Sequence, residues 1–147
     1  MRYSYKFSDA IHLLAYLVVY RDGDRSSKAI ANSIEANPSA VRKLMADLRQ
    51  AGLLVTQTGR AQPTLAKDPA TISLLDIYQA LQMDHALLHV DPATNQQGQV
   101  GGAIQPVLTD YYQEIQAAAF QRMQAITLAD VVHKIQQYNQ VQSHHEA

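Results

Sequence analysis

The sequence predicts a mainly α-helical fold with a small β-wing: a winged helix-turn-helix domain followed by a long C-terminal dimerisation helix. Three observations lead to this prediction. Short helical patterns end in a helix with one cationic face, two short strand patterns follow at once, and a long apolar helical pattern lies near the C-terminus. The first two features are typical of a winged helix that meets a polyanion, and the third of a helix that pairs with a second chain.

The composition fits one compact domain or two small lobes that share a core. The chain has 147 residues, of which 47% are hydrophobic and 17% are charged. It contains no cysteine. This excludes disulfides, zinc ions or iron–sulfur clusters held by thiolates, and cysteine nucleophiles.

Charge is divided unevenly between the two halves of the chain. Residues 1–67 carry ten basic and five acidic side chains, a net charge of +5, whereas residues 68–147 carry two basic and eight acidic ones, a net charge of −6. Such asymmetry indicates a polyanionic partner for the first half.

An apolar run over Ala10–Tyr20 is the segment that comes nearest to a targeting signal. It is too short to cross a bilayer, and His12 interrupts the pattern of a signal peptide. We therefore expect no membrane partner and a cytoplasmic location.

Capping residues predict the first two helices. Ser8 can cap a helix that Asp22–Asp24 ends. Ser26 or Ser27 can cap a short second helix, and a tight connection then leads into the third.

The third helix has the clearest boundaries. Asn37 supplies a side-chain N-cap, Pro38 occupies the first helical position, where its missing N–H costs nothing, and Gly52 is a natural C-terminal stop. Helical spacing directs apolar residues such as Val41 and Leu44 toward the core. The opposite face mixes short side chains with cationic ones: Ser39, Arg42, Lys43, Ala46 and Arg49.

A short hairpin is predicted directly after this helix. Leu53–Thr56 and Thr64–Lys67 have strand patterns, and the loop Gln57–Pro63 between them is built around Gly59 and Arg60. Two strands in this position form the wing of a winged helix-turn-helix.

Three further elements are predicted around the long C-terminal helix. Ser73–Asp76 is a capping-box pattern that opens a helix ending near Met83. Residues 84–102 lose helical periodicity and are predicted as a long loop. Thr127–Asp130 is a second capping box, which opens a last short helix before a frayed tail over 140–147.

The long helix over residues 104–125 has apolar side chains on more than one side. One side can pack on its own domain and another on a second chain, so we expect a symmetric homodimer. The chain then divides into a DNA-binding domain over 1–83, a loop over 84–102 and a helical dimerisation region over 103–147. The predicted dimer interface is one seam of the long helix: Ile104, Leu108, Tyr111, Ile115 and Ala118.

The order and spacing of four segments carry a resemblance that spans most of the chain. The segments are Met1–Ser4, Ala10–Leu14, Ala40–Leu54 and Ile72–Leu81. Together they resemble the Rrf-two family of bacterial winged-helix repressors. The resemblance implies a homodimeric transcriptional regulator that binds double-stranded DNA.

The chain departs from that family in two places. Cluster-bearing relatives place three cysteines in the loop after the 72–81 segment, where this chain has only His85 and His89 as candidate ligands. Two imidazoles cannot hold that cluster, so we expect no cofactor. In the wing the chain keeps one glycine and one cation, and the family's wing contacts are implied for Gly59 and Arg60 alone.

The predicted DNA-binding residues centre on the third helix. Ser39 and Arg42 suit base edges, and Lys43 and Arg49 suit phosphates, because a helix in the major groove needs hydrogen-bonding side chains near its N-terminus and flanking cations. The alternative interpretation is the solvated face of an amphipathic helix. The full predicted set is Arg2, Arg25, Lys28, Asn37, Ser39, Ala40, Arg42, Lys43, Arg49, Gly59 and Arg60.

Other functions find less support. His85 and His89 are four residues apart and on a helix would share one face, but such pairs near a loop are usually plain surface residues, and no metal site is predicted. His12 is most simply a hydrogen-bonded, partly buried histidine. No phosphate-cradling glycine motif or activated nucleophile occurs, so we expect no enzyme.

The alternative function is a dimeric ligand-binding or protein-interaction module that has lost specific DNA binding. An effector, if one acts, would be an unidentified small molecule. The loop 84–102 and the cleft between the long helix and the wing domain are its predicted receivers.

Overall fold

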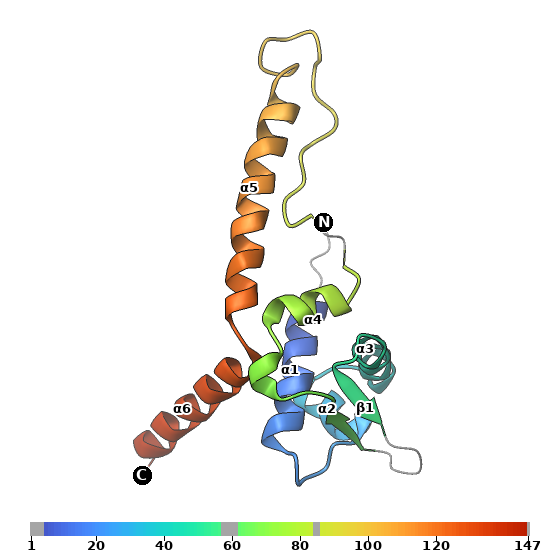
Figure 1. Ribbon diagram of the computed structural model, residues 1–147, viewed down its shortest axis with the longest axis vertical. Coiled ribbons are helices and arrows are strands. Elements are labelled where there is room, and N and C mark those ends of the chain that lie inside the picture. The colour runs from blue at the N-terminus through green and yellow to red at the C-terminus, as the bar shows by residue number, and fades with distance from the viewer. Residues whose placement is uncertain (1–4, 57–61, 84–85, 147) are drawn as a thin grey trace.

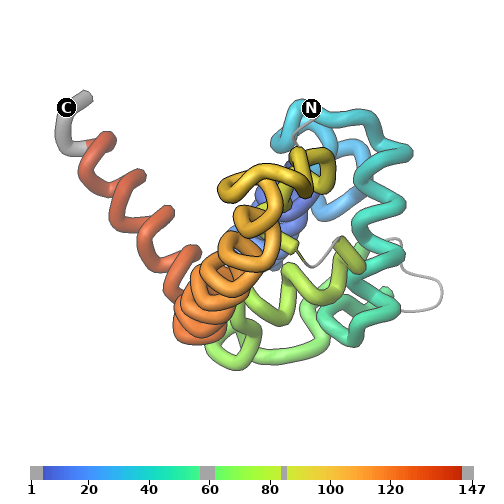
Figure 2. The backbone as a smooth tube through the Cα atoms, turned by 90° about the horizontal axis from the view of Figure 1, so that it is seen from above, coloured from blue at the N-terminus to red at the C-terminus, as the bar shows by residue number. Residues whose placement is uncertain are grey.

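The computed structural model describes residues 5–56, 62–83 and 86–146. Short helices and a two-stranded sheet form a body from which one long helix rises and a last helix leads away (Figures 1 and 2). The elements are α1 (Lys6–Val19), α2 (Ser27–Ile34), α3 (Pro38–Gln50), β1 (Leu54–Thr56), β2 (Pro63–Leu65), the 3-10 turn η1 (Pro69–Thr71), α4 (Leu74–Ala80), α5 (Ile104–Ala125) and α6 (Leu128–Glu146). The predicted fold class, mainly α with a small wing, is confirmed.

Helix α1 begins two residues before the predicted cap, and the prediction that Ser8 caps it is wrong. Its N-cap is Tyr5, with no side-chain cap. Tertiary contacts hold the additional turn instead: the ring of Phe7 meets the ring of Tyr78 edge-on at 5.3 Å between centroids, and Lys6 forms an ion pair with Asp47. These contacts outweigh a local signal worth about 1 kcal/mol.

The helix-turn-helix of α2 and α3 follows the predicted caps. The hydroxyl of Ser26 accepts a hydrogen bond from the Ala29 N–H at 3.2 Å, and the side chain of Asn37 accepts one from the Ser39 N–H at 2.8 Å. Gly52, with φ of +80°, adopts the left-handed conformation that ends α3. The two helices pack against each other and against α1.

The wing strands are antiparallel neighbours. Leu54 lies opposite Leu65, and Thr56 lies opposite Pro63. Leu54 and Pro63 are fully buried, so the hairpin is held on the body by its inward side chains. Its loop tip, residues 57–61, lies outside the described residues.

One hydrophobic core joins the wing, α1–α4 and the start of α6. Its members include Leu13 and Leu14 of α1, Leu48 of α3 and Ile77 of α4, all completely buried. Leu128 in the first turn of α6 is also completely buried in it. The beginning of α6 therefore packs as part of the winged-helix body.

Backbone hydrogen bonds fix that first turn of α6 beside the start of α4. The Leu74 N–H donates to the Ile126 carbonyl at 2.9 Å, and the Leu128 N–H donates to the Ile72 carbonyl at 2.8 Å. Both predicted capping boxes, at Ser73–Asp76 and Thr127–Asp130, form here. The division into residues 1–83, 84–102 and 103–147 stays a prediction.

Helix α5 stands away from the body, with the 86–103 segment running beside it (Figure 1). The side chain of Gln116 accepts a hydrogen bond from the Leu87 N–H at 2.9 Å, and Gln105 donates to Thr94 at 2.7 Å. At its lower end the ring of Phe120 lies 5.5 Å from that of Tyr78 in α4. None of the residues of α5 is buried.

Helix α6 continues to Glu146, so the prediction of a frayed tail over 140–147 is wrong for residues 140–146, and residue 147 lies outside the described residues. No glycine or proline follows Thr127 to stop the helix. Among the described ranges, no helix combines the length and the apolar content that a bilayer crossing requires.

Candidate nucleic-acid interface

Helix α3 has one buried and one exposed face, as its spacing predicts. Val41, Leu44, Met45 and Leu48 are buried against the body. The other face lies in solvent and presents Ser39, Ala40, Arg42, Lys43, Ala46 and Arg49. The structure thus brings five predicted DNA-binding residues onto one accessible surface.

The N-terminus of this helix is ordered by its own side chains. Asn37 is engaged as the cap, so its side-chain oxygen is used within the helix. The Ser39 hydroxyl accepts a hydrogen bond from Nη2 of Arg42 at 3.2 Å. This contact holds the guanidinium over the first turn of α3, where a helix that enters a major groove approaches base edges.

The C-terminal end of the helix is joined to the wing. Nε of Arg49 donates to the Thr56 hydroxyl of β1 at 3.2 Å, which leaves its terminal nitrogens for other partners. Lys43 is exposed between these two arginines along the helix. The contact of Thr56 with Arg49 was not predicted from the sequence, because a contact between helix and wing depends on how the hairpin packs.

The start of α2 supplies two more of the predicted cations. Lys28 is exposed, whereas Arg25 is half-buried between α1, β2 and the segment before α2. The backbone N–H of Arg25 donates to the Gln62 side chain of the wing at 3.4 Å. Nε of the Arg25 side chain is buried without a hydrogen-bond partner among the described residues. Arg25 therefore ties helix and wing together and keeps an unused donor.

Two acidic residues near these cations are held in place. Asp47 of α3 forms its ion pair with Lys6 at 3.5 Å, so its charge is offset next to the exposed face. The Ser26 N–H, and then the Ser26 hydroxyl, hold the pKa of Asp24 below its ordinary value, with a smaller contribution from Lys28. The Lys6–Asp47 pair could not be predicted, because 41 positions separate the partners in sequence.

Three predicted contacts, Arg2, Gly59 and Arg60, lie outside the described residues. Their part in DNA binding stays a prediction. His85, considered above as a metal ligand, also lies outside the described residues, whereas His89 is described and exposed. No group of three His, Cys, Asp or Glu side chains in the described part of the chain could hold a metal ion.

The predicted dimer seam lies on α5. Ile104 and Leu108 are half-covered, while Tyr111, Ile115 and Ala118 are exposed, the first two to 59% and 50%. Val107 on the same helix is 46% exposed. This is a row of apolar side chains without a covering partner in the described part of the chain.

The chain matches the model of one protein family over most of its length. Residues 3–134 match the model of the Rrf2 family, described as an iron-dependent transcriptional regulator. The chain belongs to the Rrf2 family. The resemblance to the Rrf-two family in the sequence is thereby confirmed.

Two individual proteins that are similar to this chain are named as a transcriptional regulator and a DNA-binding protein. A protein of Bacillus subtilis (strain 168) that carries the name HTH-type transcriptional regulator YwnA is 34% identical over 126 residues, which is 86% of this chain and 93% of YwnA. A solved structure named as a DNA-binding protein is 32% identical, with a TM-score of 0.68 over 86% of this chain and 97% of that one.

A more distant solved structure shares the fold. It is that of CymR, the global cysteine regulator of B. subtilis, with 21% identity and a TM-score of 0.67, covering 90% of this chain and 97% of that one.

The residues present do not fit the iron that the family description implies. A cluster needs several thiolates, and the chain has no cysteine. In the corresponding loop the described candidates are His89, which is exposed, and Asp91, whose carboxylate caps the Ala93 N–H at 2.9 Å. The residues present therefore do not fit a cluster held by cysteine thiolates.

Proposed function

We propose that this protein is a sequence-specific DNA-binding transcriptional repressor that acts as a homodimer and needs no iron–sulfur cluster. One observation carries the proposal: the accessible face of α3 presents Ser39, Arg42, Lys43 and Arg49 beside the wing. Short polar residues at the helix start fit a groove floor, and the flanking cations fit phosphates. The relatives named for transcription regulation and DNA binding support the same class and argue against an enzyme.

In this proposal DNA binding and dimerisation belong to different parts of the chain. Residues 1–83 bind DNA, and the apolar row on α5, including Tyr111 and Ile115, pairs two copies. A twofold dimer would place two α3 helices in successive major grooves, so half-sites should lie about 34 Å apart or a multiple of it. Since duplex DNA is the partner, we place the protein in the cytoplasm.

The test begins with duplexes selected from a random pool by the wild-type protein. Replacing Arg42 and Lys43 together by Ala should abolish specific binding, measured by fluorescence anisotropy against salt concentration. Loss of the Lys43 phosphate contact should also reduce the slope of log K against log salt by about one, measured on the non-specific binding that remains.

A matched variant keeps the charge change the same. Arg122→Ala with Lys134→Ala removes two cations from α5 and α6, and it should leave specific affinity and salt slope unchanged. Unchanged operator affinity in the Arg42/Lys43 variant, with an intact dimer by sedimentation, would show that the α3 face is not the binding surface.

A further inference from the structure

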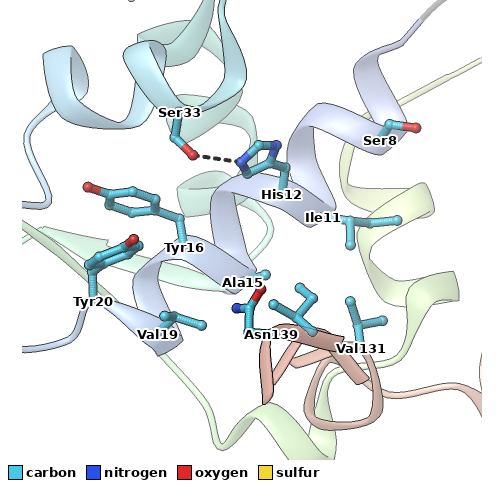
Figure 3. A pocket seen from close by; sticks show the side chains of 11 residues that line it. Ser8, Ile11, His12, Ala15, Tyr16, Val19, Tyr20, Ser33, Val131 and Asn139 are labelled. Carbon is cyan, nitrogen blue, oxygen red and sulfur yellow. Dashed lines mark hydrogen bonds between the residues drawn. The ribbon is translucent and has the colours of Figure 1, made fainter. Parts of the chain in front are cut away.

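A cavity of about 450 Å³ lies between α1 and α6, with Ser33 of α2 among the residues that line it (Figure 3). This is within the size range of small-molecule sites, roughly 300–1,000 Å³. Ile11 and Ala15 of α1 face Val131 of α6 across it, and Ile135 of α6 also lines it. The cavity is neither the loop 84–102 nor the cleft beside α5, which the sequence suggested as receivers.

The walls of this cavity are apolar, with a few polar groups that converge at the rim. Nε2 of His12 and the Ser33 hydroxyl are hydrogen-bonded at 2.8 Å, and Asn139 enters from α6 (Figure 3). His12 is exposed rather than partly buried, which corrects the sequence-based expectation, although its hydrogen bond was expected. Among the residues that the structure describes, no Asp, Glu, Lys or Arg lines the cavity.

Aromatic rings form one end of the cavity. Tyr16 and Tyr20 lie with ring centroids 4.4 Å apart and an interplanar angle of 30°. The Tyr16 hydroxyl donates to the Asp24 carbonyl at 2.8 Å, so that group is already used and the ring is what Tyr16 offers. Burial, and then the charge of Asp24, raise the pKa of Tyr16, which keeps it neutral.

We propose that this cavity binds a neutral aromatic small molecule that carries one hydrogen-bond donor. Uncharged walls disfavour an ion, because a buried charge needs a partner. The tyrosine rings fit a planar aromatic group. His12, Ser33 and Asn139 supply acceptors at the rim for an N–H or O–H group.

The position of the cavity connects it to the helix-turn-helix. Ser33 belongs to α2, which packs against α3, and Ile135 and Asn139 belong to α6. A ligand that bridges α6 and the His12–Ser33 pair would therefore bias the placement of α2 relative to α6. This regulatory part of the inference rests on the proposed function, whereas the binding site does not.

The binding test uses indole as the probe and the full-length protein. In ¹H–¹³C spectra, saturable shifts should appear at the methyl groups of Ile11, Val131 and Ile135 and at the His12 ring. 1-Methylindole, which lacks the donor, should bind about three- to tenfold more weakly, the value of one hydrogen bond. Benzoate, which is charged, should give no saturable shifts.

Two variants on the same helix locate the site. Ile135→Trp should fill the cavity from α6 and weaken indole binding by about tenfold or more. Val141→Trp adds the same ring at an exposed position that does not line the cavity, and it should bind indole as the wild type does. Equal binding by both variants, or shifts centred on another element, would overturn the site.

Sedimentation and DNA binding provide the remaining outcomes. If indole separates dimers in proportion to its occupancy, the groove holds a second copy of the chain, and the inference is wrong. Saturating indole should change duplex affinity by about 5-fold or more, in the usual range of coupling between sites. Binding of indole with unchanged duplex affinity would overturn the regulatory part while leaving DNA binding itself intact.

Discussion

The winged-helix body buries its apolar side chains, whereas helix α5 leaves its own partly or fully exposed. In α1, Leu13 and Leu14 are completely buried, whereas the 22 residues of α5 include none that is buried. Helices gain most of their stability from packing an apolar face, so α5 has little to hold it in a single chain. The comparison indicates that the body folds through its own core, while the proposed homodimer would cover the apolar side chains of α5.

Charge divides the molecule in a related way. The basic excess lies in residues 1–67, which contain α1–α3 and the wing, and the acidic excess lies in residues 68–147. A DNA duplex attracts the first part and repels the second. The charge therefore favours residues 1–67 over residues 68–147 as the part that meets a polyanion.

The largest predicted difference between the two regions concerns stability. Leu48→Ala in the body should lower the free energy of unfolding by about 2–5 kcal/mol, because it leaves a cavity in a fully buried position. Ile115→Ala on α5, where the side chain is half-exposed, should change it by less than about 0.5 kcal/mol for the monomer. Urea unfolding at low protein concentration measures both values. Equal losses would contradict the difference between body and α5.

The next largest effect concerns assembly. Tyr111→Asp with Ile115→Asp places two charges in the apolar row of α5 and should halve the mass measured by sedimentation, since buried unpaired charges are costly. The urea midpoint of the monomeric variant should stay close to that of the diluted wild type. A matched variant, Glu114→Gln, alters charge on the same helix and should remain dimeric. A dimer that survives both aspartates would place the interface elsewhere.

Local signals predicted much of this fold, and contacts between distant segments account for what they missed. The caps at Asn37 and Ser73 and both wing strands depend on neighbouring residues, and they form, although the second strand spans Pro63–Leu65 instead of the predicted Thr64–Lys67. Ser8 failed as a cap because Phe7 and Lys6 find partners far along the chain.

The candidate sites show the same limit. The exposed face of α3 follows from helical spacing alone, so the structure brings Ser39, Arg42 and Lys43 together as expected. The cavity between α1 and α6 depends on the docking of Leu128 into the core, which no sequence pattern revealed. The tail prediction failed because a polar sequence without breakers can still extend a helix.

A smaller difference in stability is expected between variants of the two capping boxes, at Ser73 and at Thr127. Ser73→Ala and Thr127→Ala each remove an N-cap and should each cost about 1 kcal/mol. Ser73 is 8% exposed and lies where α4 meets α6, so its loss should be the larger of the two. Ser143→Ala is the control, because its hydroxyl only bonds back to the Asn139 carbonyl within α6. If Thr127→Ala lowered the free energy of unfolding more than Ser73→Ala, the junction between α5 and α6 would be as rigid as the winged-helix body.

The smallest effect is expected from Asp24 and Asp130, whose pKa values are lowered by the same local cause at the starts of two different helices, α2 and α6. The Thr127 N–H, and then the Thr127 hydroxyl, stabilise the Asp130 carboxylate, as Ser26 does for Asp24. A carboxyl with a lowered folded-state pKa stabilises the fold above its ordinary value of 3.8 and loses that contribution as the pH falls through the lower value. Asp24→Asn and Asp130→Asn should therefore each flatten the decline of stability below about pH 4, measured by thermal unfolding against pH. Because the hydrogen bonds are local, the two variants should behave alike although their surroundings differ. A flattening seen only for Asp24 would show that the junction before α6 opens before the body unfolds.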